Sequence, residues 1–196
     1  MNKLQIIGIG GTNGSGKDSV GQILASRHNY LFVSVTDLLR DELKRRSMAV
    51  TRQNLRQLSA EWRRESGLGV LVDKALSKYH QQAGRFAGLA IASLRNPGEA
   101  DRVHQLGGTM LWIDADSGVR YGRIQANSAL RDRAGEDNKN FEQFLQEEES
   151  EMRQAVGGDN ATLNMLGVKE RCDVFLENNG NDLIKLQTDL EQVLDL

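Results

Sequence analysis

Cysteine is nearly absent from this sequence of 196 residues, in which Cys172 is the single example. One thiol excludes an internal disulfide framework and a zinc site made of cysteines, and it suits a reducing compartment. The histidines His28, His80 and His104 do not have the spacing of metal ligands. We therefore expect neither a disulfide-stabilised fold nor a zinc centre.

Charge of one sign and long apolar runs are also lacking. The formal net charge is −2, which provides no general attraction to nucleic acid or to an anionic membrane. No apolar run approaches the length of a membrane span, and Lys3 is followed by a strand pattern rather than by a leader sequence. We expect a cytoplasmic protein, monomeric or dimeric, without nucleic-acid or membrane partners.

What the sequence does have is an alternation of short apolar segments with helical patterns. The apolar segments are residues 4–9, 30–35, 86–93, 109–113 and 173–176. This alternation predicts an α/β fold, with a five-stranded parallel sheet, helices on both faces and ligands at the carboxyl ends of the strands.

Residues 1–196 are expected to form one domain, because no linker or repeat interrupts the pattern. A helical insertion at about 37–83 separates the second strand from the third, and it is a natural place to grip a second substrate. The polar residues 126–139 have the profile of a lid loop, and residues 157–168 are predicted to form a second loop.

The first strand leads directly into a glycine-rich loop and then into a helix. The loop is Gly11-Thr12-Asn13-Gly14-Ser15-Gly16-Lys17, followed by Asp18 and Ser19. Its glycines let successive backbone N–H groups point into one concavity, and the helix adds its positive end. Lys17 is placed to reach the outer phosphates. Three spaced glycines and a lysine, between a strand and a helix, predict that residues 11–19 bind a nucleoside triphosphate.

Arginines follow the predicted carboxyl ends of three other strands. With one nearby acid, they are Asp37 and Arg40 after the second strand, Arg95 after the third, and Arg120, Arg123, Arg131 and Arg133 after the fourth. A guanidinium binds phosphate with two parallel hydrogen bonds, so the set indicates a second phosphate-binding region. The acidic residues 147–151 are interpreted as a solvated helix face.

These motifs make the chain similar to the P-loop nucleoside monophosphate kinases of the adenylate kinase group, over residues 4–194. The segment 35–40, Val-Thr-Asp-Leu-Leu-Arg, resembles the family's Gly-Asp-Leu-Leu-Arg, and 92–95, Ala-Ser-Leu-Arg, stands where the family has Asp-Gly-Phe-Pro-Arg. Residues 51–55 and 95–99 look like an uncharacterised adenylate-kinase-like family of archaea and bacteria. Residues 16–18, Gly-Lys-Asp, resemble phage deoxynucleoside monophosphate kinases.

The resemblance implies a P-loop NTPase fold of the nucleotide kinase type that binds ATP and Mg²⁺. It implies that Arg40 and Arg95, with Asp37 beside them, hold the phosphate of the acceptor. It assigns the transferring phosphoryl group to four cations, Lys17, Arg123, Arg131 and Arg133. The ATP would contact residues 11–19, and its adenine would lie near Arg123 and the turn that contains Asn179.

Two departures from the family pattern concern the metal. The acid expected at the end of the third strand is Ala92, and the hydroxyl expected after the lysine is Asp18. Asp18 could supply the missing Mg²⁺ anchor, or it could only complement the dipole of the helix. Asp114, after the fourth strand, is ambiguous, and Asp116 is expected to cap the next helix.

These observations favour an ATP-dependent phosphotransferase that acts on a small-molecule acceptor, a nucleoside or deoxynucleoside monophosphate. A dephospho-coenzyme A kinase would keep the fold and use the insertion as a groove for the pantetheine arm. A third reading is a slow ATPase that acts as an assembly or regulatory factor, and Ala92 is the feature in its favour. Arg40 and Arg95 argue against it, because a pure switch needs no acceptor site.

Overall fold

The computed structural model describes residues 4–82, 84–127, 140–154 and 157–196. A five-stranded sheet forms its centre, and every pair of neighbouring strands is parallel, in the order β2-β3-β1-β4-β5. The strands are β1 (Gln5–Gly11), β2 (Tyr30–Ser34), β3 (Gly88–Ala92), β4 (Thr109–Asp114) and β5 (Val174–Glu177). The predicted parallel sheet is confirmed.

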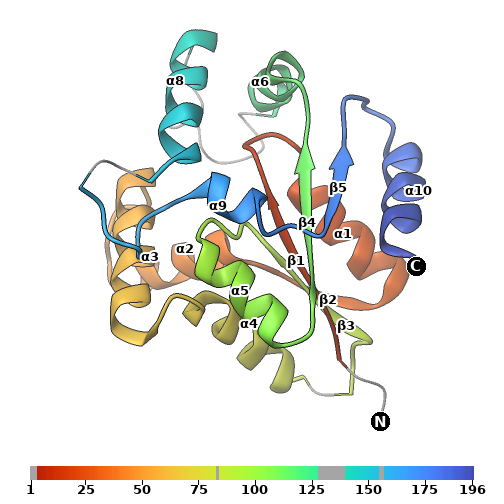
Figure 1. Cartoon of the computed structure of the whole chain (residues 1–196), viewed down its shortest axis with the longest axis horizontal. Helices are drawn as coiled ribbons and strands as arrows, with labels where there is room; N and C mark the ends of the chain where they lie inside the picture. Colours follow the sequence, from red (N-terminus) through yellow and green to blue (C-terminus); the bar gives the residue numbers. More distant parts are fainter. Residues whose placement is uncertain (1–3, 83, 128–139, 155–156) are drawn as a thin grey trace.

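Helices cover both faces of this sheet (Figure 1). On one face lie α1 (Lys17–His28) and α10 (Leu183–Leu194), which share a core with the sheet. On the other lie α2 (Val35–Arg45), α3 (Arg52–Ser66), α4 (Val70–His80), α5 (Pro97–Gln105) and α9 (Met165–Lys169). Because β1 is central and covered on both sides, its residues 6–11 are all buried, as expected for an apolar parallel strand.

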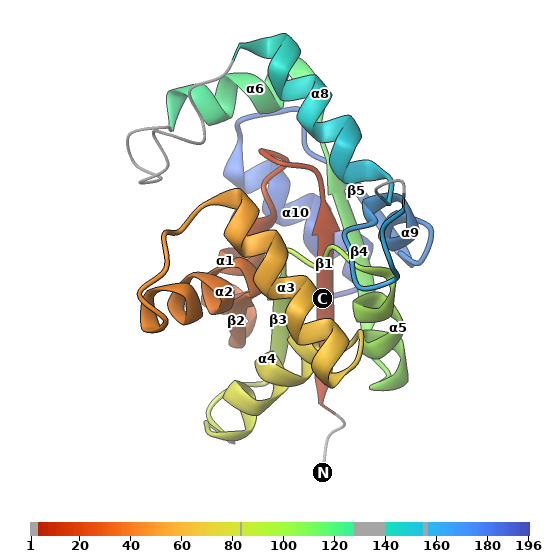
Figure 2. The same cartoon turned by 90° about the vertical axis from the view of Figure 1, so that its left-hand side faces the viewer.

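Two further helices lie beyond the carboxyl ends of the strands, α6 (Ser117–Ala126) and α8 (Phe141–Met152) (Figure 2). Aromatic rings join them, because the ring of Tyr121 on α6 lies 5.3 Å from that of Phe141 and 5.8 Å from that of Phe144. The helix α8 thus extends over the end of the sheet where the sequence predicts ligands. Throughout the described residues, no helix has the length and apolar character needed to cross a membrane.

Several boundaries differ from the prediction. The strand β2 ends at Ser34 and α2 begins at Val35, which was predicted to be the last residue of the strand, so Thr36 and Asp37 lie in the first turn of the helix. The helix α9 begins inside the predicted loop 157–168, where Asn164 caps it by accepting the N–H of Gly167. Three helices, α2 to α4, lie between β2 and β3 in the chain. Of the predicted lid, residue 126 ends α6, and residues 128–139 lie outside the described residues.

Candidate active site

The glycine-rich loop joins β1 to α1 with a backbone that few residues other than glycine adopt. The φ angle is 80° at Gly14 and 108° at Gly16, both in the left-handed region. A Cβ on Gly16 would also lie 2.6 Å from Nδ2 of Asn178. The loop is closed by Ser15, whose Oγ donates a hydrogen bond of 2.9 Å to the carbonyl of Thr12.

Lys17 is the first residue of α1, and its side chain turns back over the loop. It is 9% exposed, and its Nζ donates to the carbonyls of Gly11, over 2.9 Å, and Thr12. The residue also lines a cavity at this loop. The ammonium is therefore held at the loop, where a phosphate oxygen could replace a carbonyl as its partner.

The neighbouring strand β4 supports the loop from the side. Thr12 Oγ1 donates a hydrogen bond of 2.6 Å to Oδ1 of Asp114, which also accepts the N–H of Ala115. Trp112 Nε1 lies 3.3 Å from the other carboxylate oxygen. Asp114, ambiguous from the sequence, holds Thr12 in place, because β1 and β4 are paired in the sheet.

A cavity of about 780 Å³ extends from this loop to the inserted helices. Its volume falls within the roughly 300–1,000 Å³ of small-molecule sites. Lys17, Asp18 and Ser19 line one part, and Arg40 and Arg95 line another. The structure thus brings together the residues that the sequence predicted at the carboxyl ends of β1, β2 and β3.

Arg40 provides the clearest sign of an anionic ligand in this cavity. Its side chain extends from α2 into the lining, and its Nε is buried without a hydrogen-bond partner among the described residues. A buried donor that lacks a partner costs roughly 1–3 kcal/mol, and more when the group is charged. A phosphate oxygen of a ligand would remove this cost.

Asp37 does not line the cavity with Arg40, contrary to the prediction. Its side chain is exposed, whereas Thr36 and Arg40 both line the cavity. The reason is the early start of α2, because helical residues four positions apart share a face and the next residue is rotated by about 100°. Thr36 is therefore the residue of this turn that the sequence analysis missed.

Arg95 follows β3 and is held through its backbone and through its side chain. Its N–H donates a hydrogen bond of 2.7 Å to Oε2 of Glu99, and its Nη1 donates one of 2.8 Å to Oε2 of Glu151. The chain enters this segment through Ser93, which has a φ of 69° and lines the cavity. A non-glycine residue in that region is strained, as is common at functional sites.

The prediction that the acidic run of α8 is a solvated face is wrong. Glu147 accepts a hydrogen bond of 2.6 Å from Arg52, and Glu151 accepts one of 2.6 Å from Arg56 in addition to that from Arg95. Burial raises the pKa of Glu151, but the positive charges of Arg95, Arg56 and Arg52 outweigh it and hold the pKa at about 2. Glu151 therefore lines the cavity as an ion-paired acid, and Glu147 lines a smaller pocket that shares Arg52, Arg95 and Glu151 with the cavity.

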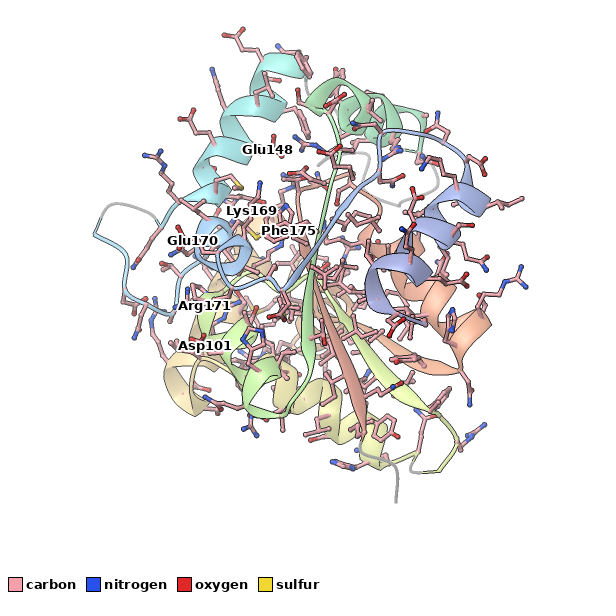
Figure 3. The ribbon with its side chains drawn as sticks, turned by 45° about the vertical axis from the view of Figure 1, so that its right-hand side comes forward. Asp101, Glu148, Lys169, Glu170, Arg171 and Phe175 are labelled. Carbon is pink, nitrogen blue, oxygen red and sulfur yellow. The ribbon has the colours of Figure 1, made fainter. Side chains whose placement is uncertain are left out.

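Arg120 is buried beneath α8 and is absent from the cavity lining. Its Nε donates to the carbonyl of Ala115 over 2.6 Å, and its Nη2 donates to Glu148 over 2.8 Å. Figure 3 shows Glu148 on the side of α8 that faces α6. Arg120 therefore links α6 to α8 through its ion pair with Glu148. The arginines predicted in the lid loop, Arg131 and Arg133, lie outside the described residues.

Arg123, predicted to contact ATP, lines the cavity. Its Nη2 donates to the carbonyl of Gly180, and its Nη1 lies 3.5 Å from the carbonyl of Gly14. Burial lowers the pKa of Arg123. This position places one cation beside both the glycine-rich loop and the turn that follows β5.

In that turn Asn178, Gly180 and Asn181 line the cavity, whereas Asn179, which was predicted to contact ATP, does not. Asn178 is buried, lines the cavity and donates a hydrogen bond of 2.8 Å from Nδ2 to the carbonyl of Ser15. Asn179 is exposed, and its side chain accepts the N–H of Asp116 over 2.7 Å. The turn directs consecutive side chains to opposite sides, so only the first reaches the loop.

Comparison with known proteins supports the fold. No family model matches the chain. A UPF0200 protein from Pyrococcus abyssi is 26% identical over 156 residues, which are 78% of this chain and 80% of that protein. TT1252 from Thermus thermophilus superposes with a TM-score of 0.54 at 22% identity, over 99% of this chain and 96% of that one. Shikimate kinase from Acinetobacter baumannii, solved with shikimate, gives 0.54 at 14% identity, over 99% and 94%.

The chain has the fold of the P-loop kinases. The predicted fold class is thereby confirmed. In this P-loop kinase fold the glycine-rich loop follows β1, which lies between β3 and β4 in the sheet.

Asp18 fits the role of a Mg²⁺ anchor in this P-loop kinase fold. Its carboxylate is exposed and lines the cavity next to Lys17, while Ala92 at the end of the neighbouring strand β3 is fully buried and provides no ligand. Nowhere in the described part of the chain do three metal-ligating acids, histidines or cysteines cluster. Mg²⁺ usually keeps several waters and takes one or two carboxylates with the substrate phosphates, so one acid suffices.

Proposed function

We propose that this chain transfers the γ-phosphoryl group of ATP to the phosphate of a nucleoside or deoxynucleoside monophosphate. The triphosphate would lie on residues 11–19, with Lys17 at its outer phosphates. The acceptor phosphate would lie between Arg40 and Arg95. The observation that carries the proposal is the buried, unpartnered Nε of Arg40 in the cavity that Lys17 also lines.

The chemistry requires positioning and charge rather than a covalent intermediate. An oxygen of the acceptor phosphate attacks the γ-phosphorus, the bond from that phosphorus to the β–γ bridging oxygen breaks, and its electron pair leaves with ADP. The product is a nucleoside diphosphate. Lys17 and Arg123 would stabilise the negative charge of the transferring group, and Arg40 and Arg95 would orient the attacking oxygen. Mg²⁺ held by Asp18 would neutralise charge on the β- and γ-phosphates.

The carboxylates of the cavity favour a phosphate acceptor over a hydroxyl acceptor. A hydroxyl must lose a proton, whereas a phosphate monoester is already ionised near neutral pH, with its second pKa at about 6. The acids in the described lining are Asp18, Glu151 and Asp182. Glu151 is held by two arginines with a pKa of about 2, and Asp182 caps α10 by accepting the N–H groups of Ile184 and Lys185.

Asp18 is therefore the one acid of the lining left for proton transfer, and it stands beside Lys17 at the donor loop. Within the described part of the chain, the acceptor half offers no carboxylate suited to act as a base. Dephospho-coenzyme A and shikimate would each react through a hydroxyl group, which needs a base. The lack of a suitable carboxylate among the described lining residues therefore disfavours both as acceptors. The adenosine of ATP would lie near Arg123 and Asn178, where Leu183 adds apolar surface to the cavity.

The test is ADP release from ATP and Mg²⁺ with each ribo- and deoxynucleoside monophosphate, with dephospho-coenzyme A and with shikimate. We expect at least one monophosphate to raise ADP release tenfold or more above the rate without acceptor. A maximal response to either hydroxyl acceptor would contradict the assignment of the acceptor. No response to any compound would favour the regulatory ATPase.

A further inference from the structure

The acceptor half of the cavity contains more arginines than one phosphate requires. Among the described residues, five guanidinium groups line it, those of Arg40, Arg52, Arg56, Arg63 and Arg95. A phosphate monoester carries a charge of about −1.5 to −2 at neutral pH. Five positive charges around one such group would favour ligands with several phosphates.

Three carboxylates of the protein pair with these arginines and offset part of their positive charge. Glu99 pairs with Arg63 over 2.7 Å, out of contact with solvent. Glu147 pairs with Arg52, and the two oxygens of Glu151 pair separately with Arg56 and Arg95. Counted over the described residues alone, five guanidinium groups against three carboxylates leave two positive charges, which one phosphate dianion would match.

We propose that Glu147 and Glu151 determine the specificity of the acceptor site, because they restrict it to ligands with one phosphate group and disfavour those with a pyrophosphate. The inference rests on the proposed function, since it takes Arg40 and Arg95 as the acceptor-binding pair. Both glutamates come from α8, whereas the arginines come from the inserted helices and the end of β3. A second phosphate beside the first would lie close to Glu151, which lines the cavity, and to Glu147, which lines a smaller pocket that shares Arg52 and Arg95 with the cavity. Like charges at short range are repelled.

The two glutamates should differ in the size of their effect. The side chain of Glu151 is 14% exposed, and that of Glu147 is 34% exposed. Water and salt screen a charge less when it is buried, so Glu151 should repel a second phosphate more strongly. Each oxygen of Glu151 binds a different arginine, and this arrangement leaves other N–H groups of both guanidiniums for a ligand.

The experiment compares the binding of inorganic phosphate and of pyrophosphate by calorimetry. The donor loop is filled beforehand with a non-hydrolysable ATP analogue and Mg²⁺, and Arg40→Ala identifies the binding that occurs in the acceptor half. The variants are Glu151→Gln and Glu147→Gln. Glu149→Gln is the matched control, because Glu149 is exposed on the same helix and its loss changes the net charge equally.

We expect the affinity for pyrophosphate relative to phosphate to rise about tenfold in Glu151→Gln, about threefold in Glu147→Gln and not at all in Glu149→Gln. An unchanged ratio in the first two variants, or an equal rise in the control, would overturn the inference. So would phosphate binding that is insensitive to Arg40→Ala. If Glu151→Gln does not fold, Glu147→Gln decides alone.

The result is separable from the test of the proposed function. A shifted ratio in a protein that phosphorylates no nucleoside monophosphate would support the charge selection and contradict the proposed activity. An active kinase whose ratio does not change in Glu151→Gln would contradict only the charge selection.

Discussion

Arg63 on α3 and Glu99 on α5 form an ion pair of 2.7 Å whose side chains are 2% and 0% exposed. Removing one partner of a buried pair leaves the other charge without compensation, which costs about 3–5 kcal/mol. Arg63→Ala should therefore lower the free energy of unfolding by that amount, measured in urea. Arg64→Ala is the control, because the adjacent arginine pairs with Asp159 at the surface and its loss should change stability little. Equal effects of the two substitutions would contradict the role assigned to the buried pair.

The same glutamate connects stability to the acceptor site. Its second oxygen, Oε2, accepts the N–H groups of Arg95 and Asn96 and so fixes the segment that carries the Arg95 guanidinium. Glu99→Gln should raise the KM for the acceptor and leave the KM for ATP within about twofold, because the donor loop is held by other contacts. Equal increases in both constants would indicate a general loss of structure instead.

Lys17 tests the donor site. Lys17→Ala should reduce the rate by a factor of 10² or more, about 3 kcal/mol, because it removes a charge next to the transferring phosphoryl group. Lys185→Ala, at an exposed lysine of α10 that pairs with Asp189, should leave the rate unchanged. The measurement is the rate constant at saturating ATP. An activity of Lys17→Ala within threefold of wild type would show that Lys17 does not act on the transferring phosphoryl group.

Arg40 and Arg123 separate the two substrates. Arg40→Ala should weaken the binding of the acceptor tenfold or more and spare ATP, since its unpartnered Nε is assigned to the acceptor phosphate. Arg123→Ala should mainly impair ATP, because Arg123 lies beside Gly14 of the loop. Equilibrium binding of each nucleotide measures both effects. The opposite pattern would mean that Arg40 belongs to the ATP site and Arg123 to the acceptor site.

Asp18 tests the metal anchor. Asp18→Asn should raise the Mg²⁺ concentration for half-maximal rate without a matching loss of metal-free nucleotide binding. Adding Ala92→Asp should not restore the rate, because Ala92 is fully buried among apolar side chains and is not among the described residues that line the cavity. A carboxylate there would be buried without a partner. An unchanged Mg²⁺ dependence in Asp18→Asn would leave Asp18 as a charge that complements the helix.

Glu151 makes stability depend on pH. Its pKa is about 2 in the fold, against an ordinary value of 4.5, so its stabilising effect is complete above about pH 4.5 and is lost as the pH falls toward 2. Glu151→Gln should therefore be less stable than wild type at pH 7, on the order of 2 kcal/mol, and the difference should shrink at pH 3. Urea unfolding at both values measures it, with Glu149→Gln as the control. A difference that stays constant with pH would assign the loss to packing.

Much of the fold and of the donor site could be predicted, because the signals are local. Residues 11–17 combine glycines and lysine directly after an apolar strand, and each strand is a short apolar segment of its own. Arg40 and Arg95 were also predicted, and they line the cavity. The errors at Asp37 and Asn179 are of another kind, since a shift of one or two residues in a helix start or a turn changes which side chain faces the cavity.

The partners of α8 could not be predicted, because they lie far away in the sequence. Glu151 is separated by 95 residues from Arg56 and by 56 residues from Arg95. The local pattern of the acidic run is that of any solvated helix face. Only the fold places this helix over the carboxyl ends of the strands, opposite α3 (Figure 2).

The central claim is that ATP and a nucleoside monophosphate react with each other in this cavity. The most direct measurement is the chromatographic identification of products from ATP, Mg²⁺ and the best acceptor of the panel. The account predicts ADP and the nucleoside diphosphate of the acceptor in equal amounts, with the yield falling at least 10²-fold in Lys17→Ala. ADP accompanied by inorganic phosphate, with no nucleoside diphosphate of the acceptor, would contradict it.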